Sequence, residues 1–364
     1  MDLLARRIRD PVGLDYCPAD GFFKEGVYSR LLDGAGTQSE RDARLWVIAT
    51  WALCFIICCF LFVGFFCRLY CRLTLGRCTS TRNMTGKTVV ITGANAGIGK
   101  ETAKDLVRRG ARVILACRNM QKASAAAREI LDETGRTVVV KRLDLCSFKS
   151  VRAFANDIIA NEERIDVLIN NAGIVPFPNR VETVDGFEQT FQTNHLAPFL
   201  LTNLLLDKLK ASAPSRIITL SSLLHHLGRL DLDKLHYQVY KVPMQVYSDT
   251  KQANVLFTKE LARRLQGTGV TANALHPGAV KTDINSTYIG LLNLLLNTVF
   301  FFFGKTPEEG AQTSIHLAVA DEVQNVSGQY FADCRLAKPS GLAEDEVLAQ
   351  KLWNISEKLT GLSA

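Results

Sequence analysis

The amino-acid sequence predicts an α/β fold: a doubly wound parallel sheet in a single domain, preceded by an N-terminal transmembrane helix. Three observations support this prediction. From residue 85 onward, short apolar strands alternate with helical patterns. A glycine-rich turn follows the first of these strands. An uncharged apolar run, residues 45–67, comes before the whole region.

Composition sets broad limits on function. The chain has 364 residues, of which 47% are hydrophobic and 22% charged, so it can bury one large domain and is not disordered by composition. The net charge of +7 is modest and fits an anionic membrane surface, a phosphorylated cofactor or no particular partner. Because no basic run is interleaved with aromatic residues, we expect no nucleic-acid partner.

The ten cysteines do not form a disulfide framework or a zinc-site spacing, so we predict no metal. Four of them lie inside the apolar run, and the others are scattered. We interpret them as buried or juxtamembrane thiols in a reducing compartment. The alternative is S-acylation of Cys67, Cys71 or Cys78, which adjoin the apolar run.

Residues 45–67 are long enough for a helix to cross a hydrocarbon core of about 30 Å. Trp46, Trp51 and Tyr70 lie toward its ends, as interfacial aromatics do. We therefore predict an arm at 1–44, a transmembrane helix at 45–67 and a basic juxtamembrane linker at 68–84. A cleaved signal peptide fits poorly because the run starts too deep in the chain. A buried core helix is the alternative.

Arginines flank this run on both sides, so the positive-inside rule only weakly favours a cytosolic C-terminal domain. We expect a single-pass protein of the endoplasmic reticulum whose C-terminal domain faces the cytosol, with a mitochondrial membrane as the alternative. Four glycosylation sequons begin at Asn83, Asn285, Asn325 and Asn354, and they would matter only in a lumen.

Six strands are predicted, at residues 87–92, 112–116, 138–144, 167–170, 216–220 and 270–274. Right-handed crossovers between them give a Rossmann-type sheet, in which ligands bind beyond the carboxyl ends of the strands. Chemically notable residues come at or just past those ends: Gly93, Arg118, Asp144, Asn170, Ser222 and Pro277. This agreement predicts one ligand site along that edge.

The turn after the first strand carries Gly93, Gly97 and Gly99, which let backbone approach the pyrophosphate of a dinucleotide. The second strand ends with Arg118, not with the acidic residue that would bind the ribose of NAD. A guanidinium there suits a 2′-phosphate, so NADP(H) is the predicted cofactor. The alternative for Arg118 is a solvated surface arginine. Asp144 either accepts from the adenine or caps the following turn.

Tyr247 and Lys251 are four residues apart and share one face of a helix. The ammonium is expected to lower the pKa of the phenol, which then exchanges a proton with a carbonyl or alcohol as hydride moves to or from the nicotinamide. Ser222 is expected to donate to the developing alkoxide. His225 and His226 are interpreted as surface residues that face different ways, and His195 and His276 as packing or backbone-bonding residues.

These motifs resemble the short-chain dehydrogenase/reductase family over residues 85–335. The resemblance rests on Thr92-Gly93-x3-Gly97-x-Gly99, Asn170-Asn-Ala-Gly173, Asn194, Ser222, Tyr247-x3-Lys251 and Pro277-Gly278-x3-Thr282. It implies four catalytic residues, Asn194, Ser222, Tyr247 and Lys251, with Asn194 fixing a helix irregularity and a water through which Lys251 exchanges protons. It implies that the residues that contact the cofactor are Gly93, Asn95, Gly97, Ile98, Gly99, Arg118, Asp144, Asn170, Ala172, Gly173, Tyr247, Lys251, Pro277, Gly278 and Thr282, the last at the carboxamide.

Within the family, Ala116-Cys-Arg118, Ser221-Ser-Leu-Leu-His-His226 and Ala253-Asn-Val-Leu-Phe-Thr258 resemble the membrane-bound retinol dehydrogenases. The resemblance implies an NADP(H)-dependent oxidoreductase that interconverts a lipophilic alcohol and its aldehyde or ketone, retinol and retinal first, with reduction as the expected direction. The alternatives are a steroid or fatty-carbonyl reductase of the same mechanism, or a silent cofactor-binding membrane scaffold.

The substrate side is expected in residues 284–304, an apolar stretch that we predict to be a lid dipping into the membrane interface. A lipophilic substrate would then enter from the membrane lipid. An ordinary buried helix pair is the alternative. Residues 336–364 are predicted to form a C-terminal helical tail. The oligomeric state is not predictable from these patterns.

Overall fold

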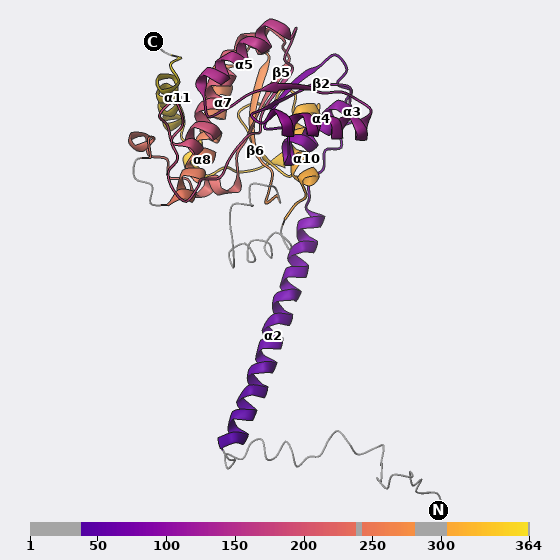
Figure 1. The fold of residues 1–364 in the computed structure, drawn as a ribbon, viewed down its shortest axis with the longest axis vertical. Helices are drawn as coiled ribbons and strands as arrows, with labels where there is room; N and C mark the ends of the chain where they lie inside the picture. The colour runs from indigo at the N-terminus through magenta and orange to yellow at the C-terminus, as the bar shows by residue number, and fades with distance from the viewer. Residues whose placement is uncertain (1–37, 238–241, 281–303, 363–364) are drawn as a thin grey trace, which may run out of the picture. The chain divides into compact units, whose positions relative to one another are not determined.

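The computed structural model describes residues 38–237, 242–280 and 304–362, drawn as ribbon in Figure 1. Residues 1–37 of the predicted arm, Thr282 and all of the predicted lid except Gly304 lie outside the described residues. The chain divides into two compact units, residues 1–66 and 67–364. We describe each unit by itself.

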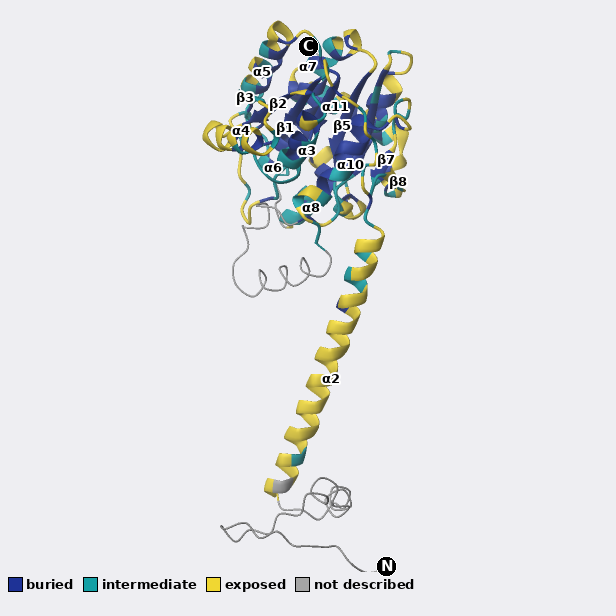
Figure 2. Cartoon of the chain, turned by 90° about the vertical axis from the view of Figure 1, so that its right-hand side faces the viewer, coloured by how far each residue is buried: buried dark blue, intermediate teal, exposed yellow. Residues whose placement is uncertain are grey.

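A long apolar helix, α2 (Gln38–Leu73), includes the predicted transmembrane run and extends past both of its ends. Its apolar part has the length and composition to cross a membrane, with 6% of its residues buried. Figure 2 colours nearly all of this helix as exposed. Large apolar side chains such as Trp46 and Phe55 are exposed, which favours a membrane span over a buried core helix.

The second unit is built on an eight-stranded sheet with the order β3-β2-β1-β4-β5-β6-β7-β8. The first seven strands are parallel and β8 is antiparallel. The strands are β1 (Thr88–Thr92), β2 (Arg112–Cys117), β3 (Val139–Arg142), β4 (Val167–Asn170), β5 (Ser215–Leu220), β6 (Val270–His276), β7 (Tyr330–Ala332) and β8 (Arg335–Leu336). The doubly wound fold and the six predicted strands are confirmed. Strands β7 and β8 are too short to produce an apolar pattern.

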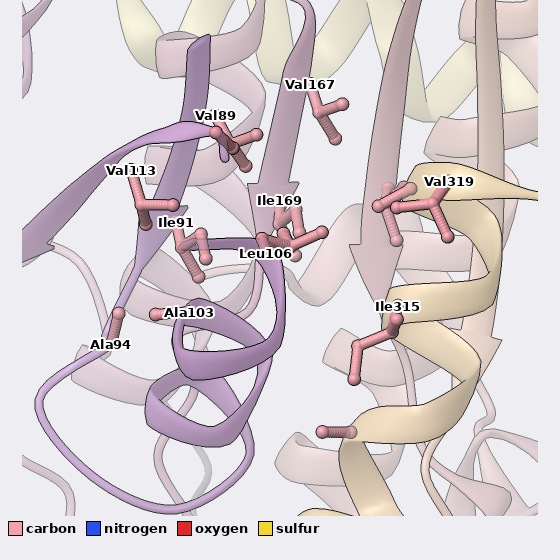
Figure 3. Close-up of a cluster of buried hydrophobic side chains, with 14 of the residues drawn as sticks. Val89, Ile91, Ala94, Ala103, Leu106, Val113, Val167, Ile169, Ile315 and Val319 are labelled. Carbon is pink, nitrogen blue, oxygen red and sulfur yellow. The ribbon is translucent and has the colours of Figure 1, made fainter. Parts of the chain in front are cut away.

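Helices cover both faces of the sheet, as the ribbon in Figure 1 shows. They are α3 (Gly97–Arg108), α4 (Met120–Thr134), α5 (Phe148–Asn161), α7 (Ala197–Ala211), α8 (Pro243–Arg264), α10 (Pro307–Val319) and α11 (Glu346–Thr360). Because successive strand residues point to opposite faces, Val89 and Ile91 enter one core cluster while Val90 enters another. Figure 3 shows the first cluster, where Leu106 of α3 and Ile315 of α10 lie with the strand side chains.

Local signals set the helix ends. Asn119 caps α4 by accepting from the Lys122 N–H at 2.9 Å, and Gly135 ends that helix in the left-handed conformation. A capping box of Thr306 and Glu309 starts α10 directly after the segment that the structure does not describe. The two ends of α4 and the start of α10 therefore follow from local sequence.

The helix predicted within the C-terminal tail, α11, packs into the same core as the sheet. Trp353 is buried. Its ring centroid lies 4.9 Å from that of Phe199 and 5.8 Å from that of Phe257. The Arg264 guanidinium lies 4.3 Å from the Trp353 ring centroid. Residues beyond 335 thus contribute to the domain that carries the sheet.

We expect Trp353→Ala to lower the free energy of unfolding by about 3–5 kcal/mol, because a buried aromatic ring leaves a cavity that its neighbours fill only partly. Lys351→Ala, on the exposed side of the same helix, is the matched control and should change stability by less than about 0.5 kcal/mol. Thermal unfolding of the detergent-solubilised chain measures both. Equal melting temperatures for the two variants would contradict the packing role of α11.

Candidate active site

The turn after β1 presents backbone groups. Gly93 and Gly97 have φ angles of +67° and +56°, in the left-handed region that favours glycine. Ala96, the N-cap of α3, offers no side-chain oxygen to the first helical N–H groups. These donors and the positive end of the helix dipole suit an anion such as a dinucleotide pyrophosphate. Asn95 and Ile98 lie in the same turn, and both are half-buried.

The loop after β4 closes against this turn. A Cβ on Gly99 would lie 2.5 Å from Asn171 Nδ2, and one on Gly93 would lie 3.0 Å from the Ala172 side chain. The Thr92 hydroxyl accepts the N–H groups of Asn171 and Ala172 at 3.1 and 3.0 Å. Asn171 Nδ2 in turn donates to the Thr92 carbonyl at 2.8 Å. The glycines are therefore required by close contact as well as by backbone conformation.

Asn170, predicted to contact the cofactor, has its side chain elsewhere. It is 2% exposed, and its Nδ2 donates to Thr202 Oγ1 on α7 at 2.9 Å. The neighbouring Asn171, for which no role was expected, makes the contact with the glycine turn. The pair of asparagines could have indicated this, because successive residues at the end of a strand point to opposite sides and only one of the two can face the turn.

At the end of β2, the Arg118 side chain is exposed, with one guanidinium nitrogen 3.9 Å from Cys146 Sγ. Asp144 Oδ1 accepts from the Cys146 N–H at 3.0 Å. The turn-capping alternative for Asp144 is thus confirmed, and this bond leaves its second carboxylate oxygen for another donor. The carboxyl ends of β2 and β3 place both residues along one edge.

Three segments meet at Gly173. A Cβ there would lie 3.1 Å from Lys251 Nζ and 3.4 Å from Asn194 Oδ1. Asn194 lies in the π-helical turn η1 (Gln192–Leu196), which agrees with the expected helix irregularity. Its side chain accepts from the Ile174 N–H at 2.8 Å and donates to the Ile174 carbonyl at 2.9 Å. The amide therefore fixes the loop that carries Gly173.

Lys251 is 4% exposed, and its Nζ donates to the Leu220 carbonyl at 3.2 Å. Burial lowers the pKa of Lys251 to about 8. Its Nζ lies 5.5 Å from the Tyr247 ring centroid, so α8 brings the two side chains to one place as their spacing predicts. The expected lowering of the Tyr247 pKa is wrong for this structure, because burial raises that pKa and only the Ser222 hydroxyl opposes the rise.

Ser222 follows β5 and caps the 3₁₀-helix η2 (Leu223–Leu227). Its Oγ accepts from the Leu224 N–H at 3.2 Å. Because that bond uses a lone pair, the hydroxyl proton stays available to an oxygen near Tyr247. Ser222 and Tyr247 are both partly exposed, whereas Lys251 is buried behind them. The arrangement offers two O–H donors to one carbonyl oxygen.

The predicted locations hold for His195, His226 and His276 but not for His225. His226 is exposed as expected, but His225 is fully buried, and its Nδ1 lies 2.7 Å from the Ser222 carbonyl. Residues three apart in a 3₁₀-helix eclipse each other, which turns His225 inward beneath Ser222. The packing and backbone-bonding roles are confirmed: His195 packs among aromatic rings, and His276 Nδ1 accepts the Gly278 N–H at 3.1 Å. The described residues contain no cluster of three side chains suited to a metal.

Past β6, Pro277 and Gly278 are the last predicted site residues that the structure describes. Gly278 has a φ of +87°, and a Cβ there would lie 2.8 Å from the Lys305 side chain. Lys305 N–H donates to the Ala279 carbonyl at 2.7 Å, so the described residues on either side of 281–303 are adjacent. The residues that the structure describes therefore fit a dinucleotide along the carboxyl edge of the sheet, beside a pair of O–H donors.

Comparison with known proteins agrees with this geometry. The short chain dehydrogenase family matches over residues 87–289. Human retinol dehydrogenase 13 is 52% identical over 300 residues, 80% of this chain and 89% of that protein. Mouse retinol dehydrogenase 11 is 50% identical over 291 residues, 80% of this chain and 91% of that protein. A short chain dehydrogenase from Shigella flexneri, solved in complex with NADP, has a TM-score of 0.57 at 26% identity and covers 70% of this chain and 100% of its own. The chain therefore belongs to the short-chain dehydrogenase/reductase family of oxidoreductases.

Proposed function

We propose that this protein is a membrane-anchored, NADP(H)-dependent oxidoreductase that interconverts a lipophilic alcohol and its aldehyde or ketone, most specifically retinol and retinal. One observation carries the proposal: Ser222 and Tyr247 offer O–H donors beside the buried Lys251, next to a glycine turn that fits a dinucleotide. Two relatives named retinol dehydrogenases, 52% and 50% identical to this chain, support this substrate class.

When bound, the nicotinamide supplies or accepts the hydride. Tyr247 gives its proton to the carbonyl oxygen in reduction and takes it back in oxidation. Ser222 donates to the same oxygen, a bond that strengthens as negative charge develops there. Lys251 would hold the ribose and support the phenol, and Asn194 would order the proton path beside it. Gly173 places no side chain against these groups, where a Cβ would lie 3.1 Å from Lys251 Nζ.

The cofactor preference rests on Arg118. It is exposed just past β2, where its guanidinium can bind a 2′-phosphate, and no carboxylate follows that strand to bind a free ribose hydroxyl. The glycine turn would hold the rest of the cofactor together with residues that follow β3 and β6. Asp144 follows β3, and Pro277 and Gly278 follow β6. Helix α2 would anchor the protein in the endoplasmic reticulum membrane with this domain in the cytosol, and residues 284–304 would cover an apolar substrate.

Tyr247→Phe should lower NADPH-dependent retinal reduction by roughly 10²- to 10⁴-fold, because it removes the proton donor and leaves the ring. Turnover is followed in microsomes at saturating retinal, with NADPH affinity measured in parallel and expected to stay unchanged. Tyr70→Phe, the same chemical change on exposed helix α2, is the control. Undiminished turnover in Tyr247→Phe would refute the mechanism, while no turnover in the wild type would favour a silent scaffold. Preference for steroid ketones over retinal in competition would favour the alternative substrate class.

Arg118→Asp should reverse the preference between NADPH and NADH, by about tenfold or more, since it replaces a 2′-phosphate ligand by a carboxylate that suits a ribose hydroxyl. Arg128→Asp, an equal charge change on the exposed side of α4, serves as the control for net charge. The ratio of kcat/KM for the two cofactors is the measurement. An unchanged ratio in Arg118→Asp would mean that this arginine is only a surface residue.

NADPH binding should take up a proton at pH 9. In the structure, the pKa of Lys251 is lowered from 10.5 to about 8, so the side chain is mostly neutral at pH 9. If ribose oxygens return its pKa toward 10.5, Lys251 takes up a proton on binding between the two pKa values, approaching about one at pH 9 and none at pH 6.5. Calorimetry in two buffers of different ionisation enthalpy measures this uptake. Lys251→Arg stays charged throughout and should show none; equal uptake in both proteins would contradict the role of Lys251.

A further inference from the structure

The buried His225 contacts the backbone of Ser222. The carbonyl of Ser222 accepts the His225 main-chain N–H at 3.0 Å and lies 2.7 Å from the Nδ1 of the same residue. His225 is 0% exposed and sits one 3₁₀ turn after Ser222. His225 therefore contacts the Ser222 carbonyl through both its main-chain N–H and its side chain.

The opposite ring nitrogen determines which tautomer is present. His225 Nε2 lies 3.0 Å from the Ser340 main-chain nitrogen, which is only a donor. Nε2 must therefore be unprotonated, so Nδ1 carries the proton and donates to the Ser222 carbonyl. Burial lowers the pKa of His225 to about 4, which keeps the ring in this neutral form. Neither nitrogen is available to act as a general base.

Tyr330 on β7 braces the ring from the side. Its hydroxyl lies 3.2 Å from His225 Nδ1, and its ring centroid lies 4.8 Å from that of His225 and 5.8 Å from that of His276. His276 accepts the Gly278 N–H at 3.1 Å. Tyr330 is 3% exposed. Two histidines, each bonded to the backbone of a loop of the site, thus pack on one buried tyrosine.

We propose that His225 is a positioning residue for Ser222: its Nδ1–H holds the Ser222 peptide, and its Nε2 ties that peptide to the backbone at Ser340, so that the serine hydroxyl faces the oxygen that Tyr247 protonates. This inference rests on the proposed function, because it assigns Ser222 a bond to the reacting oxygen. His225 touches neither substrate nor cofactor and acts only through Ser222.

Two substitutions at position 225 test the roles of the two ring nitrogens separately. Asn places an amide N–H near the position of Nδ1 and keeps the donor to Ser222, whereas Gln places its amide near Nε2 and loses that donor. We expect His225→Gln to lower kcat by about 10- to 100-fold with NADPH affinity unchanged, and His225→Asn, which loses only the bond to Ser340, to lower it by about threefold. The exposed His226→Gln is the control and should leave the rate unchanged. Each variant at position 225 loses one side-chain bond, so equal losses of kcat in both would overturn the proposal.

A second variant leaves His225 intact, in case the Gln variant does not fold. Ser340 has a φ of −64°, which proline adopts, so Ser340→Pro removes the N–H that fixes the tautomer without straining φ at that residue. We expect a loss of kcat of about threefold or more with unchanged NADPH affinity. Unchanged kcat in this variant would overturn the proposed link to Ser340.

The tautomer itself is measured by NMR of the full chain in detergent with ¹⁵N-histidine, using His225→Asn to assign the signals. A proton on Nδ1 supports the proposal, and a proton on Nε2 overturns it. This result does not depend on turnover. A wild-type protein that reduces no carbonyl refutes the proposed function, whereas an active wild type with equally impaired Asn and Gln variants refutes only the role of His225.

Discussion

The absence of a side chain at Gly173 is the constraint on which the site depends. A Cβ there would lie 3.1 Å from the Lys251 ammonium and 3.4 Å from the Asn194 amide oxygen, so the loop after β4 meets α8 and η1 only as glycine. Asn194 holds the next residue of that loop through two hydrogen bonds. Three segments far apart in the chain are thereby fixed at one point, beside the turn that suits the pyrophosphate.

Burial shifts the pKa values of the titratable side chains at this site. It raises the pKa of Tyr247 and lowers that of Lys251, so the phenol keeps its proton and the amine is poised to change charge near pH 8. A protonated phenol can give its proton to a carbonyl oxygen in reduction, and a charged Lys251 beside it would make that transfer easier. In the proposed reaction the cofactor ribose would complete the environment of the amine. The protein itself provides the two O–H donors.

Support for the site comes largely from the C-terminal part of the chain. Tyr330 of β7 and the backbone at Ser340 hold His225, and α11 packs Trp353 against Phe199 and Phe257 of the helices behind the sheet. None of these residues belongs to the catalytic or cofactor-binding motifs. A family match by motifs alone therefore describes the reacting groups and omits the layer that keeps them in place.

Much of this molecule is determined by sequence alone. Buried parallel strands are apolar runs, so six strands and their alternation with helices are readable, and the Tyr247–Lys251 spacing is a local property of one helix. The tertiary structure decides what neighbours from distant segments do to a side chain. It turns His225 inward, sends the Asn170 amide to α7 and leaves Asn171 at the glycine turn, and reverses the expected direction of the Tyr247 pKa. Burial and hydrogen bonding depend on contacts between residues far apart in the chain, which no local pattern encodes.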